Sequence, residues 1–331
     1  MGFQVMGDPS FDARTGGVNE RVAVDQIDRN RGCLLGLAVG DAVGTTVEFA
    51  PRGSFAPVTD MVGGGPFNLR PGEWTDDTSM ALCLATSLLE RRGFDARDQM
   101  ERYCRWWEEG YLSSTDRCFD IGNTVRGALM RFQQTGEPFA GSTQPHTAGN
   151  GSIMRLAPAA MYWSPNVDDV IRYCGESSRT THGAAECVDA CRYLGLILSR
   201  GLQGASKDEM LADCGDDVVA APAIRALAAG NYRQKSVDEI RGSGYVVQSL
   251  EAALWCFWKY DSFEESVLAA VNLGEDADTT GAICGQMAGV FYGESGIPRK
   301  WVERLVQASE IRAMADRLGA RSDPAVFVRF G

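Results

Sequence analysis

Histidine is scarce in this sequence, because only His146 and His182 occur among its 331 residues. The ten cysteines include no pair at CxxC spacing, so a zinc site is not expected. No apolar run approaches twenty residues, and no basic-then-apolar leader follows Met1. We therefore expect no membrane span and a cytoplasmic location in which the thiols stay reduced.

Positive charge is also in short supply. The chain has 32 Lys and Arg against 44 Asp and Glu, which gives a net charge of −12. This balance argues against a large nucleic-acid surface, since phosphate binding depends on clustered basic side chains. An acidic surface suits a basic partner, although solubility alone explains the charge at least as well.

Alternating strand patterns are rare. Only 218–220 and 245–247 fit short strands, and both fit helix ends as well. Apolar residues at three- and four-residue spacing instead predict helices over most of the chain, at 79–90, 95–109, 122–133, 184–200, 246–259, 263–272 and 300–318. The Gly- and Pro-rich stretch 55–71 is predicted to be a loop. We therefore predict an all-α fold, a single compact multi-helix domain over residues 29–331.

Residues 1–28 precede this domain as a polar segment of mixed charge with little periodicity. The composition is typical of a terminal arm, which is either disordered or docked on another protein. Both interpretations stay open.

Two stripes of glycine fit close helix packing. Gly32, Gly36, Gly40 and Gly44 recur every four residues, and so do four glycines of 281–293. Each helical glycine costs about 1 kcal/mol relative to alanine, so such a stripe indicates that another backbone must approach closely. If the two faces packed antiparallel, Glu48 would lie beside Asp276 and Asp278.

Two acidic clusters stand before helical runs, at 74–78 (Trp-Thr-Asp-Asp-Thr) and 276–280 (Asp-Ala-Asp-Thr-Thr). Asp and Thr at a helix entrance usually cap free backbone N–H groups. If the clusters converged, however, the carboxylates would repel one another unless a cation lay between them. Oxygen ligands of this kind favour Mg²⁺, Mn²⁺ or Ca²⁺.

A second loop leads into a glycine-bearing turn formed by Gly149, Asn150, Gly151 and Ser152. Free N–H groups at such a turn favour anions, phosphate in particular, although Gly-Asn-Gly is above all a turn signal. His182 similarly precedes a predicted helix, where a cap or a solvent-facing residue is the simpler interpretation.

Taken together, these motifs resemble the ADP-ribosylglycohydrolase family. The similarity rests on ordered segments across about 32–293: Gly40-Asp41-Ala42-Val43-Gly44 with Glu48, Thr75-Asp76-Asp77, Gly149-Asn150-Gly151-Ser152, Thr181-His182 and Asp276-Ala277-Asp278-Thr279. Segments 118–124 and 244–255 are most similar to the bacterial dinitrogenase reductase-activating branch, which is arginine-specific. The arm 1–28 is not part of the family's common core.

The resemblance implies a metal-dependent hydrolase that releases ADP-ribose from modified arginine side chains of a protein substrate. It implies two divalent cations, Mg²⁺ or Mn²⁺, as cofactors. Their implied ligands are Thr75, Asp76, Asp77, Asp276, Asp278 and Thr279.

The remaining site residues also follow from the resemblance. Glu48 is implied as a ligand or an acid/base group, and the general base stays open among Glu48, Asp77, Asp120 and Asp276. Asp120 would pair with the guanidinium of the leaving arginine. The turn Gly149, Asn150, Gly151 and Ser152 would bind the diphosphate, with His182 on the phosphate–ribose portion and Tyr245 stacked on adenine.

Besides an enzyme that reverses the modification, two other hypotheses remain. The family includes crystallins that have lost the chemistry, which allows a structural or binding-only protein. A third hypothesis is immunity against an ADP-ribosyltransferase toxin, either by hydrolysis or by a catalytically weak chain that occludes the toxin through its arm.

Overall fold

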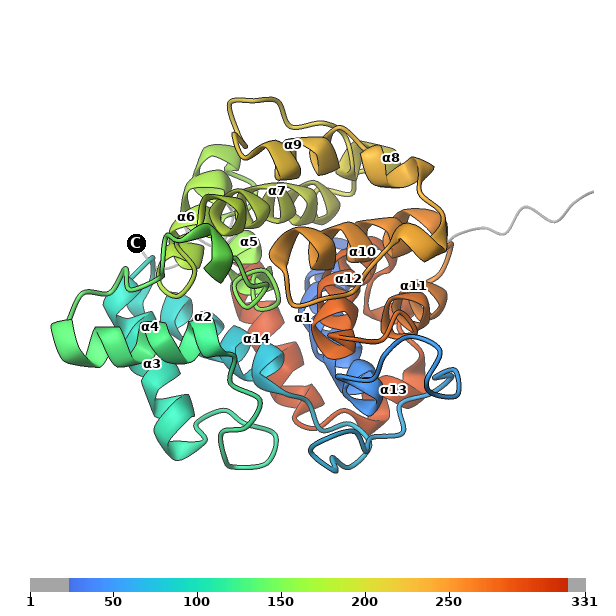
Figure 1. Cartoon of the computed structure of the whole chain (residues 1–331), viewed down its shortest axis with the longest axis horizontal. Coiled ribbons are helices and arrows are strands. Elements are labelled where there is room, and N and C mark those ends of the chain that lie inside the picture. The colour runs from blue at the N-terminus through green and yellow to red at the C-terminus, as the bar shows by residue number, and fades with distance from the viewer. Residues whose placement is uncertain (1–23, 321–331) are drawn as a thin grey trace, which may run out of the picture.

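Two glycine-striped helices, α1 (Gln26–Gly44) and α12 (Ala277–Tyr292), lie side by side in the middle of the molecule (Figure 1). The computed structural model describes residues 24–320. A Cβ atom added at Gly36 would overlap the carbonyl oxygen of Gly285, and one at Gly44 would overlap the backbone at Ala277 and Asp278. The helices are therefore antiparallel and in backbone contact, as the glycine spacing predicts.

The other helices surround this pair (Figure 1). Within residues 24–320 the regular elements are helices, with no strand beyond isolated bridges, so the predicted all-α fold class is confirmed. The further helices are α2 (Asp76–Arg91), α3 (Ala96–Glu109), α4 (Asn123–Thr135), α5 (Ala157–Trp163), α6 (Val167–Arg179), α7 (Ala185–Leu202), α8 (Lys207–Met210), α9 (Pro222–Ala228), α10 (Val246–Lys259), α11 (Phe263–Val271), α13 (Arg299–Arg304) and α14 (Ala308–Gly319).

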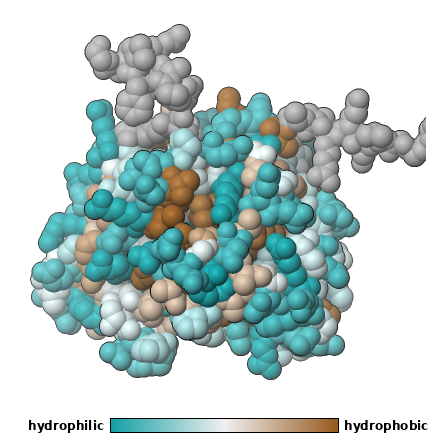
Figure 2. Space-filling model, turned by 90° about the horizontal axis from the view of Figure 1, so that it is seen from above, coloured by the Kyte–Doolittle hydropathy of each residue, from teal (hydrophilic) through white to brown (hydrophobic). Residues whose placement is uncertain are grey.

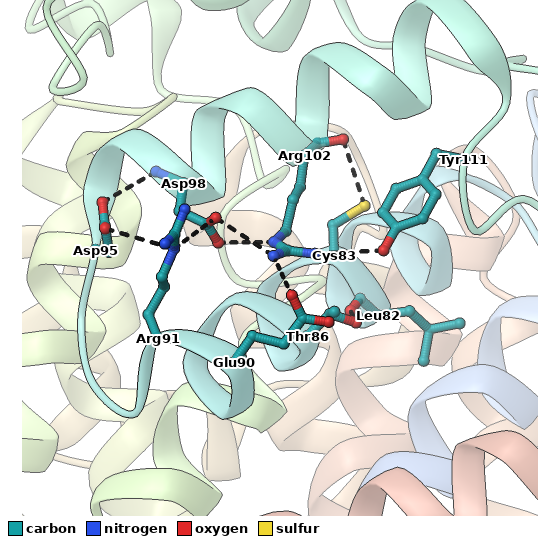
Figure 3. A network of polar contacts seen from close by, with 9 residues as sticks. All are labelled: Leu82, Cys83, Thr86, Glu90, Arg91, Asp95, Asp98, Arg102 and Tyr111. Carbon is teal, nitrogen blue, oxygen red and sulfur yellow. Dashed lines mark hydrogen bonds and ion pairs between the residues drawn. The ribbon is translucent and has the colours of Figure 1, made fainter.

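The first acidic cluster opens α2, and a polar network fixes α3 against this helix (Figure 3). Nε of Arg102 donates to Asp98 at 2.7 Å, and Nη2 donates to Glu90 of α2 at 2.6 Å. Arg91 of α2 reaches the same Asp98 at 2.8 Å. Because Arg102 and Asp98 are almost fully buried, loss of either one would leave the other to a half-exposed partner, Glu90 or Arg91. The network therefore holds the helix that carries Asp76 and Asp77.

One prediction is wrong: residues 300–318 do not form a continuous helix. The chain breaks between α13 and α14, where Gln307 has a left-handed φ of 57°. At the break, the Val306 N–H donates to the Gly72 carbonyl at 2.9 Å, and Nε1 of Trp74 donates to the Val306 carbonyl at 3.1 Å. These bonds tie the break to the segment that enters α2, a tertiary contact that helical periodicity does not encode.

Neither of the two candidate strands is a strand in the structure. Residues 218–220 are irregular, whereas 245–247 mark the start of α10, with Tyr245 bridged to Gly149. The helices α6, α8 and α9 were not predicted.

The predicted arm falls mostly on residues 1–23, which lie outside the described residues, so its role stays a prediction. The first described helix begins at Gln26 and is capped by Asp25. Within 24–320 no helix has the length and apolarity needed to span a bilayer. Seen from above, the surface is mainly hydrophilic, with small hydrophobic patches set into it (Figure 2).

Candidate active site

The two acidic clusters meet because the glycine stripes bring α12 against α1. Asp76 and Asp77 occupy the first turn of α2, and Asp278 occupies the first turn of α12. Glu48 follows α1 after a short 3₁₀ turn, Thr45–Val47. The positive ends of two helix dipoles thus face a group of carboxylates, which favours negative charge there.

The capping interpretation does not hold for the side chains at these helix entrances. Thr75 and Asp276 are the N-cap residues of α2 and α12, yet neither side chain makes a capping hydrogen bond. The Thr75 hydroxyl instead faces the carboxylate cluster, and the Asp276 carboxylate accepts from Asn150 across the site.

Three carboxylates converge on the hydroxyl of Thr75. Its Oγ1 lies 3.0 Å from Asp41, 3.2 Å from Asp278 and 3.4 Å from Asp77. A hydroxyl has one hydrogen to donate, so at most one of these carboxylates can accept it. The nearest, Asp41, is the natural acceptor. The lone pairs of Thr75 then face Asp77 and Asp278, an arrangement that a cation between these oxygens would stabilise.

Asp41 lies beneath this cluster and was not among the predicted site residues. It is fully buried and accepts from the N–H and hydroxyl groups of both Thr75 and Thr78, at distances between 2.6 and 3.2 Å. Burial raises its pKa to about 6, against the opposing effect of these bonds. The sequence feature that could have identified Asp41 is that it is a single acid within the apolar, glycine-striped run of α1.

A cleft of about 330 Å³ opens above the cluster. Its acidic wall is formed by Glu48, Asp76, Asp120, Asp276 and Thr279. Asp77 and Asp278 lie below them, and the Thr279 hydroxyl donates to Asp77 at 3.3 Å. One carboxylate oxygen each from Glu48, Asp120 and Asp278 lie within 4.8 Å of one another. The structure therefore brings all the implied metal ligands and acids together.

The electrostatics of the cluster are unfavourable without a counter-charge. Burial, followed by the charge of Asp120, raises the pKa of Glu48 to about 11. Burial and neighbouring carboxylates raise the pKa of Asp120 to about 7 and those of Asp76, Asp77 and Asp278 well above their usual range.

Within the part of the chain that the structure describes, three buried oxygens in this cluster have no hydrogen-bond partner: Glu48 Oε2, Asp77 Oδ1 and Asp278 Oδ1. Unpaired buried carboxylate oxygens around a shared hydroxyl fit a hard divalent cation. The residues present are therefore suited to the cations that the sequence resemblance implies.

The opposite wall of the cleft is formed by the turn at 149–151 and by His182. The N–H groups of Gly149 and Asn150 are already bonded, to the carbonyls of Thr147 and Gly244. Among the described residues, the N–H groups of Gly151 and Ser152 have no acceptor. The Asn150 amide donates to Asp276 at 2.8 Å and so joins the two walls.

The side chains of two predicted substrate residues lie outside this cleft. The Ser152 side chain is buried, and its hydroxyl accepts from Ser178 at 3.0 Å, so only its backbone remains for a ligand. Tyr245 lines an adjoining pocket of about 540 Å³ together with Gly149 and Glu186. Its hydroxyl donates to Glu186 at 2.8 Å, which fixes the ring at the pocket wall.

Left-handed backbone, which no sequence motif predicted, lies at the rim of the cleft. Phe49, Asp120 and Glu275 have φ values of 61°, 60° and 60°. Such values are unusual for a residue as bulky as phenylalanine, and strained backbone concentrates at functional sites. The Phe49 N–H donates to the Glu275 carbonyl at 2.6 Å, and the Phe49 side chain is 63% exposed at the cleft.

The fold and the site define an all-helical protein with a buried carboxylate centre suited to divalent cations. The model of the family described as ADP-ribosylglycohydrolase matches residues 23–325, and the chain belongs to this family.

Individual relatives agree with this assignment. The chain is 44% identical to the ADP-ribosylarginine hydrolase Tri1 of Serratia proteamaculans, over 89% of this chain and 80% of that protein. It is 34% identical to the ADP-ribosyl-[dinitrogen reductase] glycohydrolase of Rhodospirillum rubrum, over 88% of this chain and 95% of that protein. A solved structure described as an ADP-ribosylglycohydrolase-related protein complex superposes with a TM-score of 0.80 at 44% identity, over 90% of this chain and 99% of that chain.

Proposed function

We propose that this protein hydrolyses the N-glycosidic bond between ADP-ribose and an arginine side chain of a modified protein. Water adds its oxygen to the anomeric carbon C1″ and loses a proton, the bond from C1″ to the guanidinium nitrogen breaks, and that nitrogen takes up a proton in its place. The products are ADP-ribose and unmodified arginine. The observation that carries the proposal is the convergence of buried carboxylates on Thr75 at the base of the cleft. The relatives named as ADP-ribosylarginine hydrolases support the choice of arginine.

Two divalent cations, Mg²⁺ or Mn²⁺, are part of this proposal. The residues that would hold them are Thr75, Asp76, Asp77, Asp276, Asp278 and Thr279. When bound, such ions polarise ribose hydroxyls and lower the pKa of a coordinated water. The unpaired oxygens of Asp77 and Asp278 support this assignment.

Glu48 and Asp120 act on the reacting end of the substrate. Both line the cleft and have carboxylate oxygens within 4.8 Å of each other. A carboxylate at Asp120 pairs with the guanidinium of the leaving arginine, since a planar guanidinium favours carboxylate oxygens. Glu48 has one unpaired oxygen and would accept the proton of the attacking water once bound cations offset the burial and the neighbouring carboxylates that raise its pKa.

The far end of the substrate occupies the opposite wall. The free N–H groups of Gly151 and Ser152 bind the diphosphate, and His182 lies beside them. The adjoining pocket with Tyr245 accommodates the adenine, because its fixed ring offers a face for stacking.

The proposal is tested by incubating the protein with arginine-linked and serine-linked ADP-ribosyl peptides, each with Mg²⁺, with Mn²⁺ and with EDTA. We expect metal-dependent release of ADP-ribose from the arginine-linked peptide, faster than from the serine-linked one. No release with either metal would overturn the proposal.

Immunity against an ADP-ribosyltransferase toxin, through hydrolysis or through occlusion by the arm, is a finer proposal. The test is deletion of residues 1–23 of the predicted arm, because residues further along the arm take part in the fold. Asp25 caps α1, and the Asp28 carboxylate accepts from Ser295, so both must be kept. Protection lost while hydrolysis persists would support occlusion, whereas protection that follows hydrolysis would support the enzymatic route.

A further inference from the structure

Arg155 is a fully buried cation beneath the turn at the cleft. Within residues 24–320 no carboxylate forms an ion pair with it, and its Nε has no hydrogen-bond partner. Its guanidinium carbon lies 4.8 Å from the centre of the Tyr103 ring. A buried guanidinium without a carboxylate is costly, so its remaining bonds are expected to serve a purpose beyond packing.

These bonds lead to the wall of the cleft. Nη1 of Arg155 donates to the Gly151 carbonyl at 2.6 Å, within the turn that offers free N–H groups. Nη2 donates to the Thr181 hydroxyl at 2.7 Å. The oxygen of this hydroxyl lies in turn 2.9 Å from Nδ1 of His182. Arg155 thus contacts the turn directly and reaches His182 through Thr181.

The direction of the bonds fixes the histidine tautomer. A guanidinium can only donate, so the Thr181 oxygen accepts from Arg155. If Nδ1 of His182 also donated to this oxygen, the buried hydroxyl hydrogen would have no acceptor among the described residues, so the hydroxyl donates and Nδ1 accepts. An imidazolium is disfavoured, because burial, followed by the charge of Arg155, lowers the pKa of His182 to about 3. The single ring hydrogen therefore lies on Nε2.

The Nε2 edge of the ring faces the cleft. A Cβ built at Gly151 would lie 3.2 Å from Nε2, and one built at Gly149 would lie 3.5 Å from it. Both glycines and His182 line the cleft. Among the described residues Nε2 has no hydrogen-bond partner, so its hydrogen is available to a ligand.

We propose that Arg155 and Thr181 are positioning residues, which hold His182 as the neutral Nε2–H tautomer so that it donates a hydrogen bond to an anionic oxygen in the cleft. This inference rests on the proposed function, because the anion it names is the diphosphate of ADP-ribose. Neutral His182 then works beside the N–H groups of Gly151 and Ser152, and the buried charge of Arg155 adds to the attraction.

The chain suits a direct spectroscopic test because it has only two histidines. Imidazole ¹⁵N spectra distinguish a protonated ring nitrogen from an unprotonated one, and His146→Gln assigns the signals. We expect His182 to be protonated at Nε2 and not at Nδ1 near pH 7. Thr181→Val, which removes the hydroxyl at nearly constant shape, should convert it to the Nδ1–H form or to a mixture. Thr181→Ser should restore the wild-type spectrum.

Thr180→Val is the matched control. Thr180 is equally buried, and its hydroxyl also lies near Arg155, at 3.4 Å, but among the described residues it donates to the Ser177 carbonyl and not to His182. We expect this variant to keep the Nε2–H form.

Binding of ADP-ribose in the presence of Mg²⁺, measured by calorimetry, supplies the second readout. Loss of one hydrogen bond to a charged group predicts about tenfold weaker binding for Thr181→Val, with Thr181→Ser and Thr180→Val close to wild type. A wild-type His182 protonated at Nδ1 would overturn the inference. So would Thr181→Val with an unchanged tautomer, or an equal loss of affinity in Thr181→Ser.

Failure of this inference can be distinguished from failure of the proposed function. A wild-type protein that shows the Nε2–H form but does not bind ADP-ribose would overturn the proposed function, and with it the anion named here. Hydrolysis by the wild-type chain together with the wrong tautomer would overturn only the positioning role of Arg155 and Thr181.

Discussion

The hydroxyl oxygen of Thr75 lies 3.2 Å from a carboxylate oxygen of Asp278, although 203 residues separate them in the chain. Thr75 precedes α2 and Asp278 belongs to the first turn of α12. Neither helix needs this contact for capping. The contact joins the two acidic clusters, and the glycine-to-glycine packing of α1 on α12 makes it possible.

This packing leads to a stability prediction. Gly36→Ala should destabilise the fold by about 2–3 kcal/mol, because the added methyl group meets the backbone of Gly285 and not a movable side chain. Chemical denaturation checks this value. Gly127→Ala in α4 is the control, since a Cβ there meets nothing within 4 Å. It should be neutral or slightly stabilising, because alanine favours a helix. Equal effects of the two variants would contradict backbone contact.

Asp41 is predicted to control metal affinity without touching substrate. Asp41→Asn keeps the size of the side chain but places N–H groups where Thr75 and Thr78 also donate. The Thr75 oxygen would then accept from the introduced amide and turn its hydrogen toward Asp77 and Asp278, where a cation needs a lone pair. We expect Mn²⁺ to bind about 10–100-fold more weakly, as measured by calorimetry. Ser87→Ala, elsewhere on α2, should leave Mn²⁺ affinity unchanged, and unaltered affinity in Asp41→Asn would contradict its positioning role.

Stabilisation by metal should depend on pH. The carboxyls of Asp76, Asp77, Asp120 and Asp278 have pKa values raised above those of the unfolded chain. Without metal, the stability they contribute is fully present below about pH 4 and is lost as pH rises through the folded pKa, about 7 for Asp120.

A divalent cation replaces the protons that are lost, so the gain in Tm on adding Mg²⁺ should be larger at pH 8 than at pH 5.5. The expected stabilisation is about 2.7 kcal/mol when Mg²⁺ is at about a hundred times its Kd. Thermal unfolding at both pH values, with Mg²⁺ and with EDTA, measures it. A gain that is greater at pH 5.5 would contradict competition between protons and metal.

Asp120 should determine which leaving group is accepted. Asp120→Asn removes the negative charge that would pair with a guanidinium. Its kcat/KM on arginine-linked ADP-ribose should fall by about 10–100-fold, in line with a lost bond between charged groups. On the serine-linked substrate, which has no positive leaving group, the loss should be smaller. Competition between the two peptides measures the ratio directly, and an equal loss on both would remove this role from Asp120.

Much of the site could be predicted from sequence because its residues stand in short motifs with local chemical meaning. The glycine repeats also predict the register of α1 on α12, since only glycine tolerates such an approach. The break at Gln307 could not be predicted, because it depends on bonds from Val306 to Gly72 and Trp74. The Arg155–Thr181–His182 arrangement was hidden for a similar reason: its members are polar residues whose burial and direction appear only in the fold.

The most direct measurement for the whole account is metal-dependent release of ADP-ribose by the Asp76→Ala/Asp278→Ala double variant. Asp261→Ala, whose side chain is 91% exposed, serves as the control, and circular dichroism confirms folding. The account predicts that the double variant stays folded but releases no ADP-ribose from arginine with Mg²⁺ or Mn²⁺, while the control keeps full activity. Full activity in the folded double variant would contradict a shared metal centre at Asp76 and Asp278.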